Sequence, residues 1–204
     1  MTFSPSLPAL EAAHGRVSHR AFQPGPLPRE RVEELLAAVA QAPSAYNIQP
    51  WRFVVVSDPE LKDRLAEAAF GQPQVRSAPA VIVVTTDMGD VMAHLDEIAN
   101  PAVGEIGQQE FVARVRGAYG NLPADALETL GASQGGIALG YLLLLAASLG
   151  LGTSPMLGFD PAKVRGLLGL ADHVRIPALV AIGLPTDAGM PRHRHALDRI
   201  VSWR

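Results

Sequence analysis

Apolar residues along this chain recur with two periods, one typical of helices and one of strands. Between residues 29 and 40 they fall at i, i+3, i+4 and i+7, which predicts an amphipathic helix. The runs 51–56, 80–86 and 177–185 are continuous, apolar and rich in β-branched residues, as buried strands are. Residues 87–125 mix glycine, proline and scattered charge, and their pattern predicts no regular element.

Two further helices are predicted from an Asp-Pro pair, because aspartate caps a helix and proline fits its first turn. They run from Asp58-Pro59 to about Phe70, and from Asp160-Pro161 to about Leu168. A short helix is expected over residues 8–13, ending at Gly15. Because helices and strands intermix without regular βαβ units, we expect an α+β fold in one domain covering residues 1–204.

A segment without charged residues extends from residue 131 to 159 and predicts a long helix at about 126–149. Its length would allow it to span a membrane, which takes about 20 apolar residues. The absence of a flanking basic cluster argues against that role. We therefore expect a helix buried in a large core or an oligomer interface, where Gly136 and Gly140 let a neighbouring helix approach closely.

Composition narrows the function more by exclusion than by indication. A net charge of −3 gives no sign of nucleic-acid binding. The absence of cysteine excludes disulfides, thiolate metal sites and cysteine nucleophiles. The first 16 residues lack the charged and apolar regions of a secretion signal, so a cytoplasmic location and no membrane partner are expected.

Two arginine-rich stretches, residues 16–20 and 192–194, stand at opposite ends of the chain. In extended chain alternate side chains point the same way, so Arg192 and Arg194 could bind one anion. Each stretch is either part of a phosphate clamp or an ordinary solvated surface segment. A metal site at His193 and His195 has only weak support.

A polar loop, "PSAYNIQP" at residues 43–50, directly precedes the strand at 51–56. It is longer and more polar than a plain turn requires. The chain has no G-x-G-x-x-G motif, P-loop or G-x-S-x-G motif. A polar loop and candidate anion clamps without an evident catalytic group suggest that a bound cofactor supplies the chemistry.

Five segments occur in an order that resembles the FMN-dependent nitroreductase family over residues 14–204. They are "GRVSHRAF", "APSAYNIQPWRFVVVSD", "GQPQVRSAPAVIVVTTD", "LGLGTSPMLGFDPAKV" and "PRHRHALDRIV". The resemblance implies a nitroreductase-like α+β fold with a central mixed or antiparallel β-sheet flanked by helices. It also implies an intertwined homodimer with two FMN sites at the interface, and the long apolar helix at the dimer core.

The same resemblance implies which residues contact FMN. Arg16, Ser18, Arg192 and Arg194 are expected at the phosphate and ribityl end, and Arg20 near the pyrimidine edge. The full set implied is Arg16, Val17, Ser18, Arg20, Pro43, Ser44, Ala45, Asn47, Gln72, Gln74, Pro155, Met156, Leu157, Gly158, Arg192 and Arg194.

Within that set, Pro43, Ser44, Ala45 and Asn47 are expected to reach the flavin of the partner subunit. Gln72 and Gln74 stand where many relatives have a polar or cationic flavin contact. The backbone amides of Leu157 and Gly158 are expected near flavin N5 and O4. Many relatives have Glu or Gly where this chain has Leu157, which alters the pocket wall more than the hydrogen bond.

The activity implied is ping-pong transfer of hydride from NADH or NADPH, through flavin N5, to a small-molecule acceptor such as a nitroaromatic or a quinone. No catalytic side chain is implied, because the flavin is the reactive centre. The rivals are enoate reduction, dehalogenation or dehydrogenation on the same fold, a non-catalytic flavin-binding protein, and a membrane protein. Phe111 and Tyr119 could stack on an acceptor, or simply pack beneath a surface helix.

Overall fold

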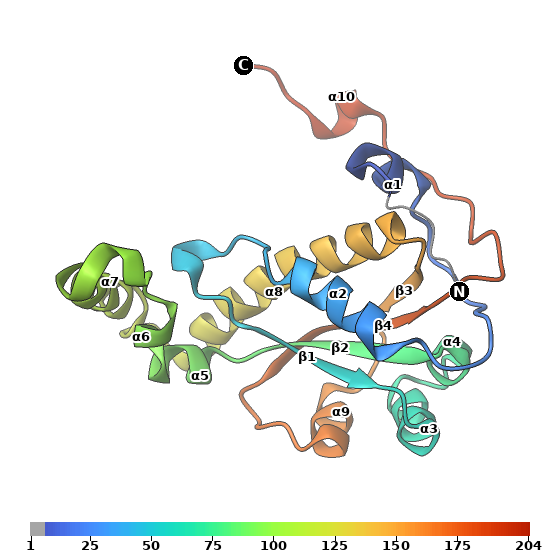
Figure 1. Ribbon diagram of the computed structural model, residues 1–204, viewed down its shortest axis with the longest axis horizontal. Coiled ribbons are helices and arrows are strands. Elements are labelled where there is room, and N and C mark those ends of the chain that lie inside the picture. Colours follow the sequence, from blue (N-terminus) through green and yellow to red (C-terminus); the bar gives the residue numbers. More distant parts are fainter. Residues whose placement is uncertain (1–6) are drawn as a thin grey trace.

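The computed structural model describes residues 7–204 and is built around a four-stranded sheet (Figure 1). The strands are β1 (Trp51–Val56), β2 (Ala80–Thr86), β3 (Gly152–Met156) and β4 (Arg175–Gly183). Their order is β1-β2-β4-β3, and all three neighbouring pairs are antiparallel. Residues 1–6, part of the stretch examined for a secretion signal, lie outside the described range.

Both faces of the sheet are covered by helices, so successive residues of β2 enter different cores. Val81 and Val83 pack with α3 (Pro59–Ala68), α4 (Pro73–Ser77) and α9 (Pro161–Leu168). Ile82 and Val84 pack on the other face with α2 (Arg29–Val39) and α8 (Ala124–Ser148). In Figure 1, α2 and α8 lie above the sheet and α3 and α9 below it. This two-sided burial explains the continuous apolar run of β2.

The long helix α8 lies against the sheet along a single stripe of its surface. Its buried residues recur every three or four positions: Glu128, Gly131, Gly135, Ala138, Leu142 and Ala146. A Cβ atom on Gly135 would stand 2.6 Å from Thr86 Cγ2, so glycine permits this close approach. Open space surrounds Gly136 and Gly140, which were expected to meet a neighbouring helix. At these two glycines the outward face of α8 is not packed against any other described element.

By length and composition, α8 is apolar enough to cross a membrane, and only 28% of its most apolar window is buried. The side of α8 that packs on the sheet is buried like that of a core helix. Ile137 and Tyr141 are over a third exposed on the other side.

A smaller core forms at one end of the sheet. It joins Ile48, Met88, Val91, Leu95 and Val115, which are all buried. Most of these residues lie on α5 (Met88–Ala93), α6 (Leu95–Ile98) and α7 (Gly104–Tyr119). The short helix η2 (Pro101–Val103) connects α6 to α7, and Ile48 directly follows η1 (Ala45–Asn47). We refer to this end as the loop end.

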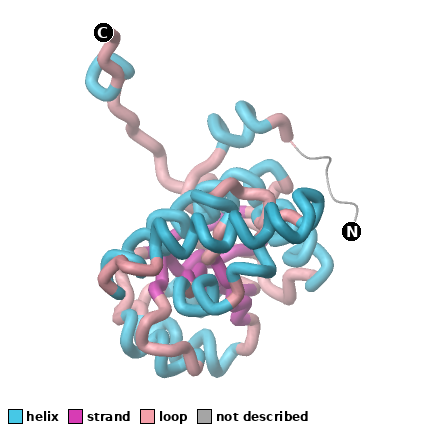
Figure 2. The backbone as a smooth tube through the Cα atoms, turned by 90° about the vertical axis from the view of Figure 1, so that its left-hand side faces the viewer, coloured by secondary structure: helices cyan, strands magenta, loops and turns pink. Residues whose placement is uncertain are grey.

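At the other end of α8 lies α1 (Ala9–Gly15). Beyond β4 the chain is exposed from residue 190 onward and includes the short helix α10 (Leu197–Ile200). Figure 2 shows this C-terminal arm projecting away from the body. Its apolar residues have no cover within the described chain; Trp203 is 93% exposed.

Most predicted elements are confirmed, with small shifts at their ends. The strand expected at 177–185 lies two residues earlier, at Arg175–Gly183. Eight described elements were not predicted: η1, α4, α5, α6, η2, α7, β3 and α10. Four of them, α5, α6, η2 and α7, lie within residues 87–125, where no regular element was expected. Strand β3 contains Pro155, which is tolerated because β3 is at the edge of the sheet. Helix α7 has little amphipathic pattern, because Val115 is its one buried residue.

Candidate functional site

The first arginine-rich stretch runs beside the edge strand β3. Ser18 forms a parallel bridge with Thr153, and the backbone N–H of His19 donates to Thr153 O at 2.9 Å. Farther along, Phe22 bridges Pro185 in antiparallel fashion. This stretch is thus fastened to the sheet rather than loosely solvated, which places Arg16 at a defined position.

The second arginine-rich stretch returns to the first. Arg192 Nη1 donates to Ala13 O at 3.1 Å and to Arg16 O at 3.4 Å. The pKa of Arg16 is lowered, first by burial and then by the positive charges of Arg194 and Arg192. The fold therefore brings together three guanidinium groups from the two ends of the chain.

The innermost of these groups has an unused hydrogen-bond donor. Arg16 Nη1 is buried and makes no hydrogen bond to any described residue. A cavity of about 190 Å³ opens beside it, lined in part by Arg16, Val17 and His19. Three neighbouring cations with a spare donor are unfavourable by themselves and favourable around a dianion.

A second group of predicted residues is joined by side-chain contacts. Gln72 Nε2 donates to Gly158 O at 2.8 Å, and Gln74 Nε2 to Gln72 Oε1 at 3.0 Å. Gln74 Nε2 also lies 3.3 Å from Met156 Sδ. These contacts bring residues 72–74 to the end of β3. Leu157 is 76% exposed there and forms a free apolar surface.

The polar loop is held in a strained conformation. Tyr46, Asn47 and Gln49 all have positive φ, at 51°, 55° and 42°. For residues other than glycine this left-handed region costs about 1–2 kcal/mol each. The backbone N–H of Gln49 donates to Ser44 Oγ at 3.0 Å, and that of Ala45 to Gln134 Oε1 at 2.9 Å.

Within one chain this loop lies far from the arginines. It is tied to α8 at Gln134, whereas Leu7, just before α1, bonds to Ser148 at the far end of α8. Fourteen residues of helix separate these points, or about 21 Å at 1.5 Å per residue. Within the single chain, contacts therefore assemble the arginine group and the group around Gln72 and Gly158. The third predicted group, residues 43–47, lies apart from the arginines.

The two aromatic residues considered for an acceptor site pack into the loop end. Phe111 and Tyr119 are partly buried against the small core. The Tyr119 ring meets Tyr46 edge to face, with centroids 5.5 Å apart. Burial, and then the neighbouring Tyr46, raise the pKa of Tyr119. Both residues therefore have a packing role, and Tyr119 supports the strained loop.

Sequence reasoning missed Asp187, which contacts the first arginine-rich stretch. Its carboxylate accepts from His19 Nδ1 at 2.6 Å and from the backbone N–H of Arg20 at 2.9 Å. The only sequence signal is one acidic residue in the turn "LPTDAG" after the last strand. Sequence reasoning also missed the role of Gln134, a polar residue of the apolar helix α8 that accepts from the N–H of Ala45.

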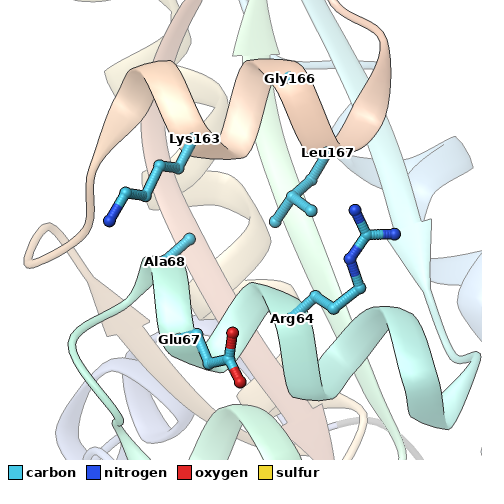
Figure 3. A pocket seen from close by; sticks show the side chains of 6 residues that line it. All are labelled: Arg64, Glu67, Ala68, Lys163, Gly166 and Leu167. Carbon is cyan, nitrogen blue, oxygen red and sulfur yellow. The ribbon is translucent and has the colours of Figure 1, made fainter.

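A more spacious cleft, of about 420 Å³, lies elsewhere, between α3 and α9 (Figure 3). Its charged lining residues do not converge: Lys163 and Arg64 lie at opposite ends, and Glu67 points away from both. None of the predicted site residues lines it. The cleft therefore lacks the focused charge found around Arg16.

Known proteins resemble this chain over nearly its whole length. The family model described as "Nitroreductase family" matches residues 13–184. A Thermus thermophilus protein named NADH dehydrogenase is 46% identical over 200 residues, covering 98% of each chain. A Bacillus subtilis protein provisionally named NAD(P)H nitroreductase is 33% identical, covering 96% of this chain and 97% of its own.

Two solved structures share the fold over nearly the whole chain. A protein from Exiguobacterium sibiricum, assigned as a nitroreductase and solved in complex with FMN, is 31% identical. It superposes with a TM-score of 0.91 and full coverage of both chains. CLA-ER, an enone reductase of gut-bacterial fatty acid saturation, is 25% identical with a TM-score of 0.86, covering 96% of this chain and 97% of its own.

Proposed function

Because the chain belongs to the nitroreductase family, we propose that it is an FMN-dependent NAD(P)H oxidoreductase that reduces nitroaromatics, quinones or similar acceptors. The observation that carries the proposal is the buried Arg16 Nη1, without a described hydrogen-bond partner and beside two further guanidinium groups. Phosphate accepts several hydrogen bonds at once, and arginine matches it in bidentate geometry.

The residues present fit the phosphate end of FMN. Gathering Arg16, Arg192 and Arg194 without an anion would cost free energy through repulsion and desolvation. A dianionic phosphate removes this cost and uses the spare donor of Arg16. Ser18, fixed beside Thr153, adds a hydroxyl on the same side of the chain.

The remaining contacts divide between two subunits of a homodimer. From the same chain, Arg20 and Gln72 serve as donors to the ring system, beside the backbone of residues 155–158, and Gln74 holds the Gln72 side chain in place. From the partner, the loop of residues 43–47 covers the flavin. This division accounts for the separation of about 21 Å along α8 between the loop and the C-terminal end of α8. Arg16 lies at that end, beside Ala147, and we refer to it as the arginine end. The division also gives the outward face of α8 a partner.

FMN supplies the redox chemistry when bound, by accepting hydride from NADH or NADPH and delivering it to the acceptor in a second half-reaction. The chain's own residues bind the cofactor and orient the cofactor and the acceptor. Gln74 is buried and held by Gln72 and Met156, so its amide has a fixed direction. Exposed Leu157 beside Gly158 provides an apolar wall for a planar acceptor.

A second candidate activity is reduction of an activated carbon–carbon double bond. It is favoured by the likeness to CLA-ER, an enone reductase, at a TM-score of 0.86. The same site would serve both reactions, since hydride delivery is common to them. A protein that binds flavin without turnover is the remaining alternative.

The test is made on the purified full chain. We expect a flavin absorption spectrum and FMN as the flavin released on denaturation. Oxidation of NADH and NADPH is then measured alone and with a nitrobenzoate, a benzoquinone or an α,β-unsaturated ketone. Faster oxidation with the first two supports the proposal, and preference for the ketone supports the second candidate. Flavin-free protein that takes up no added FMN would refute both.

A further inference from the structure

The carboxylate of Asp187 accepts four hydrogen bonds, three of them from residues 19–21. Oδ1 accepts from His19 Nδ1 at 2.6 Å and from Gly189 N at 3.3 Å. Oδ2 accepts from the backbone N–H of Arg20 at 2.9 Å and of Ala21 at 3.1 Å. Among the described residues, none of those assigned to FMN makes so many hydrogen bonds between the two ends of the chain.

Directly after Asp187 the chain crosses the same stretch at very short range. Gly189 has a φ of +70°, and a Cβ atom there would stand 2.3 Å from Val17 Cγ2 and 3.2 Å from Ser18 O. Three residues later, Arg192 donates to the backbone of Ala13 and Arg16. The return segment is thus fastened on both sides of Arg16, by Asp187 on one side and by Arg192 on the other.

We propose that Asp187 is a positioning residue for the phosphate clamp, fixing residues 16–20 against residues 187–194 so that Arg16, Arg192 and Arg194 converge. The inference rests on the proposed function, because it takes FMN phosphate as the ligand. Asp187 itself touches no ligand. It acts through His19 and the backbone of Arg20, and determines the distance between cations that would otherwise separate.

Other contacts keep the fold intact without Asp187. The backbone N–H of Gln23 donates to Leu184 O at 2.8 Å, and that of Thr186 to Ala21 O at 3.0 Å. These bonds hold the two segments in register next to the sheet. Loss of the carboxylate therefore loosens residues 19–21 from residues 187–189, while Ser18 and His19 keep their backbone contact with Thr153.

The carboxylate has its full effect when ionised. The backbone N–H of Arg20 lowers the pKa of Asp187 most; burial opposes it, and the side chain of His19 and the N–H of Ala21 lower the pKa further, so the net direction is down. An amide in its place would keep one acceptor and turn an NH₂ group toward backbone donors. Asp187→Asn is thus a nearly isosteric variant that loses part of these hydrogen bonds, and Asp187→Ala removes all of them.

The experiment compares apo-protein binding of FMN with binding of riboflavin, which lacks the phosphate. Wild type, Asp187→Asn, Asp187→Ala and Asp172→Asn are titrated by flavin fluorescence. Asp172→Asn is the matched control: it removes the same charge from an exposed position near the opposite end of β4. We expect the Kd for FMN to rise at least tenfold in both Asp187 variants, with the Kd for riboflavin within twofold of wild type.

Hydrogen exchange of the apo-proteins gives a readout independent of flavin. Backbone amides of Arg20 and Ala21 should exchange faster in the Asp187 variants, and those of β4 should not. An unchanged FMN affinity, or an equal loss for FMN and riboflavin, would overturn the inference. If wild type bound neither flavin, the proposed function itself would fail, which separates the two outcomes.

Discussion

The two ends of α8, the arginine end and the loop end, differ in how they hold the predicted contact residues. At the arginine end, residues 166 to 179 positions apart are joined by several hydrogen bonds, and the predicted contacts converge within one chain. At the loop end, the predicted contacts stand on a short strained turn with three positive φ values. One end gathers its residues internally and the other presents them outward. A homodimer with the site shared between two copies, as proposed above, accounts for this difference.

An aspartate–histidine pair stabilises each end. At the arginine end Asp187 lies 2.6 Å from His19, and at the loop end Asp87 lies 2.9 Å from His173. Asp87 also caps α5 through the N–H of Asp90, and its own N–H donates to Pro50 O. The two pairs thus fix the segments that bear the predicted contacts, from opposite ends of β4.

The largest effect is expected from Ile137→Glu on the outward face of α8. Ile137 is over a third exposed in the single chain, so the fold should tolerate glutamate. In a dimer interface, however, a buried carboxylate costs several kcal/mol. We expect a monomer without FMN, measured by light scattering and absorbance. Ala162→Glu, at an exposed position of α9, is the control and should remain a flavin-containing dimer. A folded Ile137→Glu monomer with normal FMN content would contradict the division of the site between copies.

Arg194→Ala tests the arginine end alone. Hydrogen bonds to charged groups contribute about 1.5–3 kcal/mol, which corresponds to roughly one to two decades in affinity. We expect the Kd for FMN to rise by that factor while the dimer persists. Arg199→Ala, in the exposed α10, provides a charge-matched comparison. Equal FMN content in wild type and Arg194→Ala after dialysis would show that this arginine does not hold the phosphate.

At the loop end, Asn47 offers a test of strain. Because its φ is 55°, Asn47→Ala should lower the free energy of unfolding by about 1 kcal/mol, while Asn47→Gly should keep it nearly unchanged. Urea unfolding of the two variants measures the difference. If alanine and glycine were equally stable at position 47, the loop would not store the strain inferred here.

The smallest effect is expected from pH acting on Asp87. Burial raises the pKa of Asp87, but the N–H of Asp90 and then His173 lower it further, so the net direction is down. A lowered folded-state pKa adds stability above the ordinary Asp pKa of about 3.9, and this stability is lost as pH falls through the folded value. Asp87→Asn should therefore destabilise the chain at pH 7, with a smaller difference below about pH 3. A destabilisation independent of pH would assign the effect to hydrogen bonding alone.

Local pattern was sufficient for most of the secondary structure. Strands β1 and β2 were predicted residue for residue, and α2, α3 and α9 nearly so. Their signals are local: continuous apolar runs in the strands, helical spacing in α2, and Asp-Pro starts in α3 and α9. The Asp58 carboxylate does accept from Leu61 N, as a capping residue should.

Elements whose stability comes from distant partners were missed. Strand β3 contains glycine, serine and proline, and it is a strand because β4 and residue 18 pair with its two edges. Helix α7 contains Gly107 and Gly117, each costing up to about 1 kcal/mol relative to alanine. Packing of Val115 against α5 and α6 offsets that cost.

By itself, the sequence determined the family, the order of the motifs and the chemical character of the candidate contacts. Arginine, amide and hydroxyl side chains indicate a polar, anionic ligand, whatever their position in the fold. Only the tertiary structure decided which of them meet. The sheet order β1-β2-β4-β3 brings Arg16 to Arg192, Gln72 to Gly158 and Asp187 to His19, and it leaves Ala45 at the far end of α8. The physical reason is range: side-chain periodicity and capping act over a few residues, whereas these contacts depend on how the sheet closes the chain on itself.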